Sequence, residues 1–209
     1  MRDNYETTKN EMQDAFLAYP QDRMISRFGL RHDEDHLYIR FFDRSYRIDR
    51  RSGKAEWLIE SSGEWMPAGF NDAMTIYDVL CQSKEGCHPT FEWVSVSGLS
   101  PIMGGSLSRG LDFFSNAGAS FEGKPAELAA ACERMGERKW RGGDAAYEMD
   151  MFPFLPVALR FYDRDDEYPA SLQFFTDRNI LDYMHYETLM YALSYLLGRL
   201  REDTDKSMR

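Results

Sequence analysis

Short segments in which apolar and polar side chains alternate constrain the fold of this chain more than any other feature of its sequence. In residues 37–42, Leu37 and Ile39 would lie on one face of an extended strand, and the residues between them on the other. Three further runs show a similar pattern: 24–30, 46–48 and 55–59. Charged or Gly-containing turns separate these runs, as at residues 33–35 and 51–53. The pattern predicts an antiparallel meander.

A second group of alternating segments occupies the C-terminal half of the chain. Residues 157–161 and 172–175 alternate on either side of an acidic turn, which predicts a hairpin, and residues 91–96 predict another strand. Strands are thus grouped in hairpins, with no strand–helix–strand alternation running through the chain. A doubly wound parallel sheet is therefore not expected.

Apolar residues at helical spacing predict helices in four segments: 5–19, 70–80, 125–135 and 186–200. Pro20 would end the first helix, and Pro125 and Gly136 would bracket the third. The fourth segment has the longest apolar stripe, from Tyr186 to Leu200. The Gly- and Ser-rich region Gly98–Gly123 receives no assignment.

These elements predict the α+β class, with helices packed on one face of a mainly antiparallel sheet and a long C-terminal helix. The chain has 209 residues, of which 43% are hydrophobic, so it is long and apolar enough to bury one core. No Gly/Pro/Ser-rich linker marks a boundary. We expect a single domain over residues 1–209, with residues 202–209 forming a frayed tail.

The charge of the chain argues against nucleic acid as a partner. Asp and Glu number 35 against 25 Lys and Arg, which gives a formal net charge of −10. Such a chain repels a phosphate backbone at long range. The same charge is compatible with cations, basic partners or mere solubility, so it identifies no ligand.

Neither a membrane location nor a disulfide framework is expected. No run approaches the ~18 apolar residues that a transmembrane helix needs, and the amino terminus lacks the apolar core of a secretory signal. The three cysteines, Cys81, Cys87 and Cys132, are too few and too unevenly spaced for a disulfide framework. We therefore expect a cytoplasmic protein with reduced thiols.

An acidic turn is the densest polar cluster in the sequence. Carboxylates at residues 163–167, with others nearby, could converge on a hard cation if a strand–turn–strand brought them together. The candidate metal ligands are Asp165, Asp166, Glu167, Asp177 and His185. An EF-hand is excluded, because Tyr168 stands where that loop needs Gly and Phe174 where it needs its last Glu. A solvated hairpin turn explains the cluster more simply, and we favour that interpretation.

The other polar motifs match no catalytic or cofactor template. His185 has no orienting partner that spacing alone would assign. Gly104-Gly105-Ser106-Leu107-Ser108 lacks both the Gly-Lys-Ser/Thr of a P-loop and the second Gly of a nucleophile elbow. Cys87-His88 lacks the second ligand pair of a zinc site. No catalytic residue is assigned, no cofactor-binding residue is predicted, and the cofactor remains unknown.

Four segments of the last third carry a resemblance to a known family: Gly143-Asp144 with the residues to Met149, Phe154-Leu155-Pro156-Val157, residues 165–171, and Phe174-Phe175-Thr176-Asp177. A Gly-Asp segment, a Leu-Pro-x-Pro-like strand entry, an Asp-Glu-Phe/Tyr-Pro-Ala turn and a Phe-Asp strand end recur in this order in that family. The chain resembles the uncharacterised prokaryotic family catalogued as domain of unknown function family 3786. Looser agreement upstream, at residues 28–30 and 93–99, extends the resemblance over nearly the whole chain.

The resemblance implies the kind of organism in which the protein occurs, but no activity. Members occur mostly in anaerobic bacteria and archaea, and some relatives carry a cysteine-rich iron–sulfur segment beside the domain. The three scattered cysteines of this chain do not supply the four thiolates of a cluster, so an iron–sulfur function is not transferred.

Two hypotheses about function follow, and neither assigns a reaction. The first is a non-catalytic, cytosolic binding or accessory module that receives a small ligand or a protein partner on an open face or edge of its sheet. It is favoured because aromatic residues are abundant while no nucleophile–base pair is recognisable. The alternative is a metal-dependent, hydrolase-like enzyme that uses Asp165–Glu167 with Asp177 and His185. Homo-oligomerisation through a sheet edge or helix stripe stays open.

Overall fold

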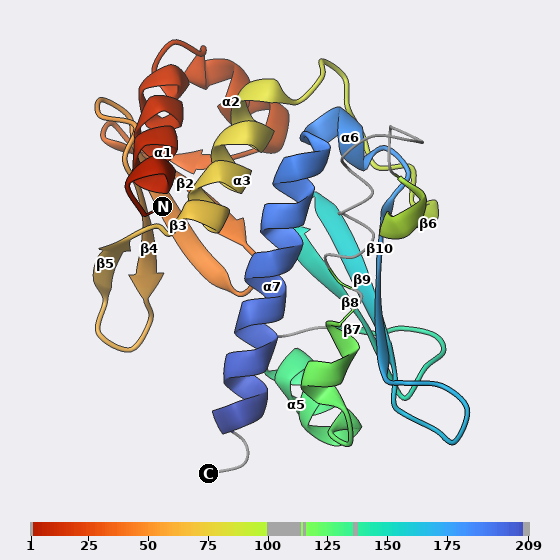
Figure 1. Ribbon diagram of the computed structural model, residues 1–209. Coiled ribbons are helices and arrows are strands. Elements are labelled where there is room, and N and C mark those ends of the chain that lie inside the picture. The colour runs from red at the N-terminus through yellow and green to blue at the C-terminus, as the bar shows by residue number, and fades with distance from the viewer. Residues whose placement is uncertain (1, 100–113, 115, 136–137, 207–209) are drawn as a thin grey trace. The chain divides into compact units, whose positions relative to one another are not determined.

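The computed structural model describes residues 2–99, 114, 116–135 and 138–206 (Figure 1). The contacts of the chain group it into two compact units. The first unit contains Met1–Cys87, Phe152–Phe154 and Leu181–Ala192, and the second contains His88–Met151, Leu155–Ile180 and Leu193–Arg209. The prediction of a single domain over residues 1–209 stays a prediction.

The first unit contains a five-stranded antiparallel meander with the strand order β1-β2-β3-β4-β5. Its strands are β1 (Arg31–His32), β2 (His36–Phe41), β3 (Arg44–Asp49), β4 (Ala55–Ile59) and β5 (Glu64–Pro67). The alternation that predicted the sheet is real, because Leu37 and Ile39 are buried while Arg40 is exposed. The meander expected from the sequence is therefore confirmed.

Helices accompany this sheet in the first unit: α1 (Arg2–Phe16), α2 (Gln21–Phe28), α3 (Phe70–Gln82), the residues of α6 (Ile180–Tyr183) from Leu181 on, and the beginning of α7 (Tyr186–Lys206). The helix predicted at residues 70–80 is present as α3. Its inner face buries Ile76, Tyr77 and Leu80.

The segment that begins with α2 corrects one prediction from the sequence. We expected residues 24–30 to form a strand, but Gln21–Phe28 is helical. The helix starts directly after Pro20 and ends at Gly29, whose φ of 60° lies in the left-handed region that glycine adopts without strain. Met24, Phe28 and Leu30 stand at even-numbered positions and so fit a strand alternation as well as a helix, which explains the wrong prediction.

The second unit contains another five-stranded sheet, with the order β6-β10-β9-β8-β7. Its strands are β6 (Trp93–Ser95), β7 (Arg138–Lys139), β8 (Ala145–Phe152), β9 (Leu155–Tyr162) and β10 (Ser171–Asp177), of which Phe152 is grouped with the first unit. The hairpin predicted around the acidic turn is β9–β10, paired antiparallel. The short helix α5 (Pro125–Arg134) matches the helix predicted at residues 125–135.

The α+β class and the long C-terminal helix are confirmed. The helix α7 has 21 residues and continues to Lys206, into the segment predicted to fray; Thr204 there is buried and donates its hydroxyl to the carbonyl of Leu200. Most of Gly98–Gly123 lies outside the described residues, although Gly118–Phe121 forms a 3₁₀ turn. Among the helices of the described part, none is long and apolar enough to cross a membrane.

Candidate functional site

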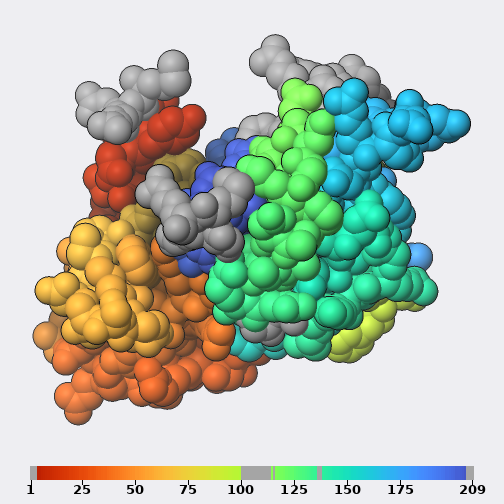
Figure 2. Space-filling model, turned by 90° about the horizontal axis from the view of Figure 1, so that it is seen from below, coloured from red at the N-terminus to blue at the C-terminus, as the bar shows by residue number. Residues whose placement is uncertain are grey.

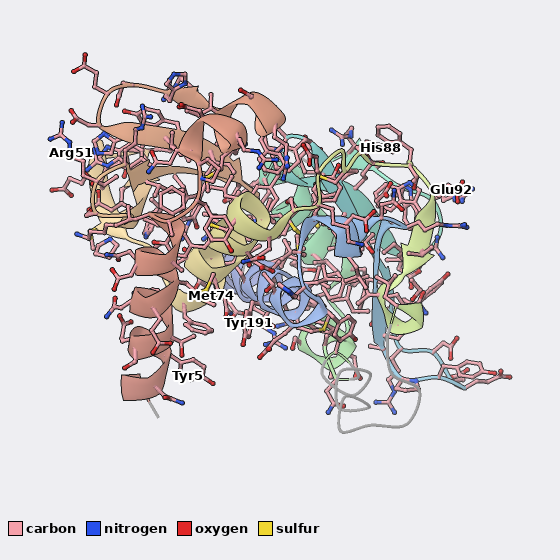
Figure 3. The ribbon with its side chains drawn as sticks, turned by 90° about the horizontal axis from the view of Figure 1, so that it is seen from above. Tyr5, Arg51, Met74, His88, Glu92 and Tyr191 are labelled. Atoms are coloured by element: carbon pink, nitrogen blue, oxygen red, sulfur yellow. The ribbon has the colours of Figure 1, made fainter. Side chains whose placement is uncertain are left out.

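A groove of about 440 Å³ lies between three helices of the first unit. Its lining side chains come from α1, α3, the residue that precedes α7 and the beginning of α7: Asn4, Tyr5, Thr8, Met12, Phe70, Met74, Asp78, Gln82, His185, Glu187, Thr188 and Tyr191. Figure 3 shows how Tyr5, Met74 and Tyr191 come from the three different helices that border it. Concave sites that combine apolar walls with a few fixed polar groups are typical of small-ligand binding.

His185 and Asp78 provide the fixed polar group of this groove. The Nδ1 of His185 lies 2.8 Å from Oδ1 of Asp78, and the backbone N–H of His185 donates to Oδ2 of the same carboxylate at 2.8 Å. The Asp78 side chain is only 6% exposed, whereas that of His185 is 70% exposed. The buried carboxylate therefore fixes the imidazole through Nδ1, while most of the His185 side chain stays exposed.

Aromatic rings form a continuous cluster along the same groove. The centroid of Phe70 lies 4.7 Å from that of Tyr5 and 5.2 Å from that of Tyr191, both in edge-to-face geometry. The hydroxyl of Tyr191 donates to Oε1 of Glu187 at 2.6 Å. Burial, together with this hydrogen bond to a carboxylate, raises the pKa of Tyr191, so its phenol keeps its proton at neutral pH.

Burial disfavours the thiolate form of the nearby Cys81. Cys81 lies one turn after Asp78 on α3, and burial, with a smaller contribution from the charge of Asp78, raises the pKa of the Cys81 thiol to about 12. A thiol with such a pKa is protonated at neutral pH, and only the thiolate is strongly nucleophilic. Burial likewise raises the pKa of Cys87. The groove therefore has no activated cysteine beside its imidazole.

The acidic turn predicted as a metal site lies between β9 and β10 and projects from the second unit (Figure 2, light blue). Asp165 accepts the backbone N–H groups of Glu167 and Tyr168 at 2.9 and 2.7 Å. These two bonds lower the pKa of Asp165, with that from Tyr168 contributing most. Asp166 and Glu167 are exposed. The turn is thus organised by its own backbone.

A groove of about 720 Å³ opens beside this turn, and its lining includes Asp165, Tyr168 and Asp144. Asp144 accepts the backbone N–H of Asp163 at 2.7 Å, and Asp163 in turn accepts the N–H of Gly123 at 2.8 Å. Asp144 and Asp163 therefore hold neighbouring loops together beside this groove.

Asp177 lies at the opposite end of β10 from the acidic turn. Seven residues of β10 separate the two ends by about 20 Å at the usual rise per residue of a strand. The Asp177 carboxylate is buried and accepts hydrogen bonds from the hydroxyl of Thr90 and the backbone N–H groups of Phe91 and Asn179. It fixes the segment before β6 to the end of β10.

The five predicted ligands are therefore distributed between the two units. Asp165, Asp166, Glu167 and Asp177 belong to the second unit, and His185 belongs to the first. Within the described residues, no three His, Cys, Asp or Glu side chains are grouped as metal ligands. The metal-binding role of these residues stays a prediction.

Asp78 was not predicted as a site residue, because its contact with His185 joins residues 107 positions apart. One signal was present. Within the helical pattern of residues 70–80, Asp78 follows the buried Tyr77 and stands four residues after Met74, where an unpaired carboxylate would be costly to bury. A buried acid of this kind requires a partner, although the sequence does not say which one.

Comparisons with known proteins identify the family alone. Searches of curated proteins and of solved structures found no match. A family model described as "Domain of unknown function (DUF3786)" matches residues 21–199. That range includes the groove residues of α3 and α7, while the groove residues of α1 precede it. The chain belongs to this family, DUF3786, as its resemblance in the last third of the sequence indicated.

Proposed function

We propose that the protein is a non-catalytic binding module whose first unit receives a small organic ligand in the groove between α1, α3 and α7. The observation that carries this proposal is the exposed imidazole of His185, fixed by the buried carboxylate of Asp78 beside a cluster of aromatic rings. A polar group that is already oriented loses little entropy when it binds a ligand. The aromatic walls would cover the apolar part of that ligand.

Binding is supported over catalysis by the surroundings of the imidazole. A His–Asp pair can act as a general base, but covalent catalysis needs a nucleophile within hydrogen-bonding reach of the imidazole. The described side-chain hydrogen bond of His185 is to Asp78, and two nearby hydroxyls have other partners: Tyr191 donates to Glu187 and Thr8 donates to the carbonyl of Asn4. The arrangement therefore supports recognition.

The test is a screen of small metabolites against the purified full chain by thermal shift, with hits confirmed by ¹H–¹⁵N NMR. A ligand of the groove would perturb the resonances of its lining residues. Thr8→Trp would fill the groove and weaken that binding at least about tenfold. Asn10→Trp is the matched control, because Asn10 is exposed on the same helix and does not line the groove. A screen without any ligand sensitive to Thr8→Trp would reject the proposal.

The alternative, a metal-dependent hydrolase-like enzyme, has weaker support. Asp165 and Asp177 already accept hydrogen bonds from backbone N–H groups, and Asp78 holds Nδ1 of His185. Elemental analysis of the purified protein, with melting curves in Mg²⁺, Mn²⁺ and Zn²⁺, separates the two ideas. A stoichiometric metal that raises the melting temperature, and is lost in Asp165→Asn, would favour the enzyme.

The cellular setting is part of the same proposal. The three cysteines are too few and too unevenly spaced for a disulfide framework, which supports action in the reducing cytoplasm. The family resemblance supports an anaerobic prokaryote as the host. An accessory role toward a protein partner, or self-association, would be detected as co-purification or as a change in mass by size-exclusion chromatography with light scattering.

A further inference from the structure

We infer that the groove between α1, α3 and α7 selects an organic cation: an amine, protonated or methylated, carried on an apolar body. This inference rests on the proposed function and adds the chemical class of the ligand. It follows from the charges, the aromatic rings and the sulfur atoms that line the groove.

The charge of the lining favours a cation. Two carboxylates, Asp78 and Glu187, line the groove, and no Lys or Arg is among its lining residues in the described part of the chain. If His185 is protonated, it offsets one of the two negative charges, and one remains. An anionic ligand would therefore meet net repulsion, whereas the chain's formal charge of −10 attracts cations from a distance.

Glu187 is the carboxylate available to a ligand. Asp78 is buried, and both of its oxygens bond to His185. Glu187 is exposed, and its Oε1 accepts the hydroxyl of Tyr191 at 2.6 Å. This bond orients the Glu187 carboxylate beside the ring of Tyr191. An ammonium group at this position would meet a fixed negative charge and an aromatic ring together.

The remaining walls suit the ammonium and its apolar substituents. Tyr5, Phe70 and Tyr191 form the aromatic cluster, and Tyr5 is 50% exposed, so part of it is accessible to a ligand. Aromatic faces attract organic cations, and the polarizable thioethers of Met12 and Met74 adapt to an alkyl or aryl body. A hard metal ion would instead need several converging oxygens.

Three probes of one shape test the charge class: 2-phenylethylammonium, 2-phenylethanol and phenylacetate. Each is titrated into the full chain at neutral pH and followed by ¹H–¹⁵N NMR. We expect the ammonium to bind at the groove in the millimolar range or tighter, at least about fivefold tighter than the alcohol, and phenylacetate to bind weakest.

Glu187→Gln should lower the affinity for the ammonium about threefold to fivefold and leave that for the alcohol unchanged, because an exposed ion pair contributes modestly. Glu11→Gln is the matched control: Glu11 is exposed on α1, does not line the groove, and changes the net charge equally. Equal effects of the two substitutions would overturn the inference, since the charge would then act only at long range.

The remaining results of the three titrations also test the inference. If the alcohol or phenylacetate binds the groove as tightly as the ammonium, the cation inference fails while the proposed binding function stands. If none of the three probes binds, the inference fails as well. The proposed function is then judged separately by the metabolite screen and its Thr8→Trp variant.

Discussion

At the scale of single residues, the described structure uses its buried carboxylates as connectors. Asp78 holds the residue that precedes α7, and Asp177 holds the segment before β6. Asp78 accepts one backbone N–H group and Asp177 accepts two, in each case near the boundary of a helix or strand. Buried acids in this family member therefore have a structural role whether or not a ligand binds nearby.

Replacing Asp78 should destabilise the protein. Asp78→Ala removes the acceptor of two hydrogen bonds from His185, so we expect the free energy of unfolding to fall by about 2 kcal/mol. Urea denaturation followed by circular dichroism measures the change. His185→Ala should cost less, because the ring of His185 is mostly exposed and the backbone N–H bond survives. Equal stability of Asp78→Ala and the parent chain would contradict the connector role.

Phe91 is an exposed aromatic residue whose backbone adopts a left-handed conformation. Its φ is 58°, its side chain is 73% exposed, and its N–H donates to the buried Asp177. A left-handed conformation costs an L-residue about 1–2 kcal/mol. We expect Phe91→Gly to raise the free energy of unfolding by about 0.5–1 kcal/mol, after the entropy of the unfolded glycine is deducted.

Thermal and chemical denaturation of three chains test this expectation. Phe91→Ala is the control, because it removes the ring but keeps the Cβ atom that causes the strain, and its stability should match the parent chain. A loss of stability in Phe91→Gly would mean that the ring makes contacts that outweigh the backbone strain.

At the scale of elements, long periodic segments were predictable and mixed ones were not. The apolar stripe of α7 predicts a helix and the alternation of β2 predicts a strand, because each element has one buried face. The strand β8 was not predicted: six of its eight residues are buried, so its two faces do not alternate. The apolar residues in and just after the short helix α2 fit both the helical period and the strand alternation. The groove was not predictable, because it joins helices that are distant in sequence.

The helix α7 contains a glycine, Gly198, whose replacement by alanine should stabilise the helix. Gly198 is exposed, and a Cβ atom built on it meets nothing within 4 Å. Gly198→Ala should therefore stabilise the protein by about 0.5–1 kcal/mol, because alanine loses less conformational entropy in a helix. Gly29→Ala is the opposite control: Gly29 caps α2 at φ 60°, so alanine there should lower stability in the same urea titration. A destabilised Gly198→Ala chain would count against the assigned helix.

At the scale of the whole molecule, the two compact units share chain segments rather than following one another. The first unit includes Phe152–Phe154 from the middle of the sequence, and α7 contributes residues through Ala192 to the first unit and residues from Leu193 on to the second. Unfolding of either unit would thus disrupt a helix that the other one needs. This sharing supports our proposal that residues 1–209 behave as one cooperative domain.

The four tryptophans allow that proposal to be tested unit by unit. Trp57 and Trp65 report on the first unit, and Trp93 and Trp140 on the second. We expect a chain with Trp57→Phe and Trp65→Phe and a chain with Trp93→Phe and Trp140→Phe each to melt in a single transition, with fluorescence and circular dichroism midpoints that coincide. Because cooperative coupling requires both probes to follow the same equilibrium, fluorescence midpoints that differ from the circular dichroism midpoints within these chains would show two independently folding domains.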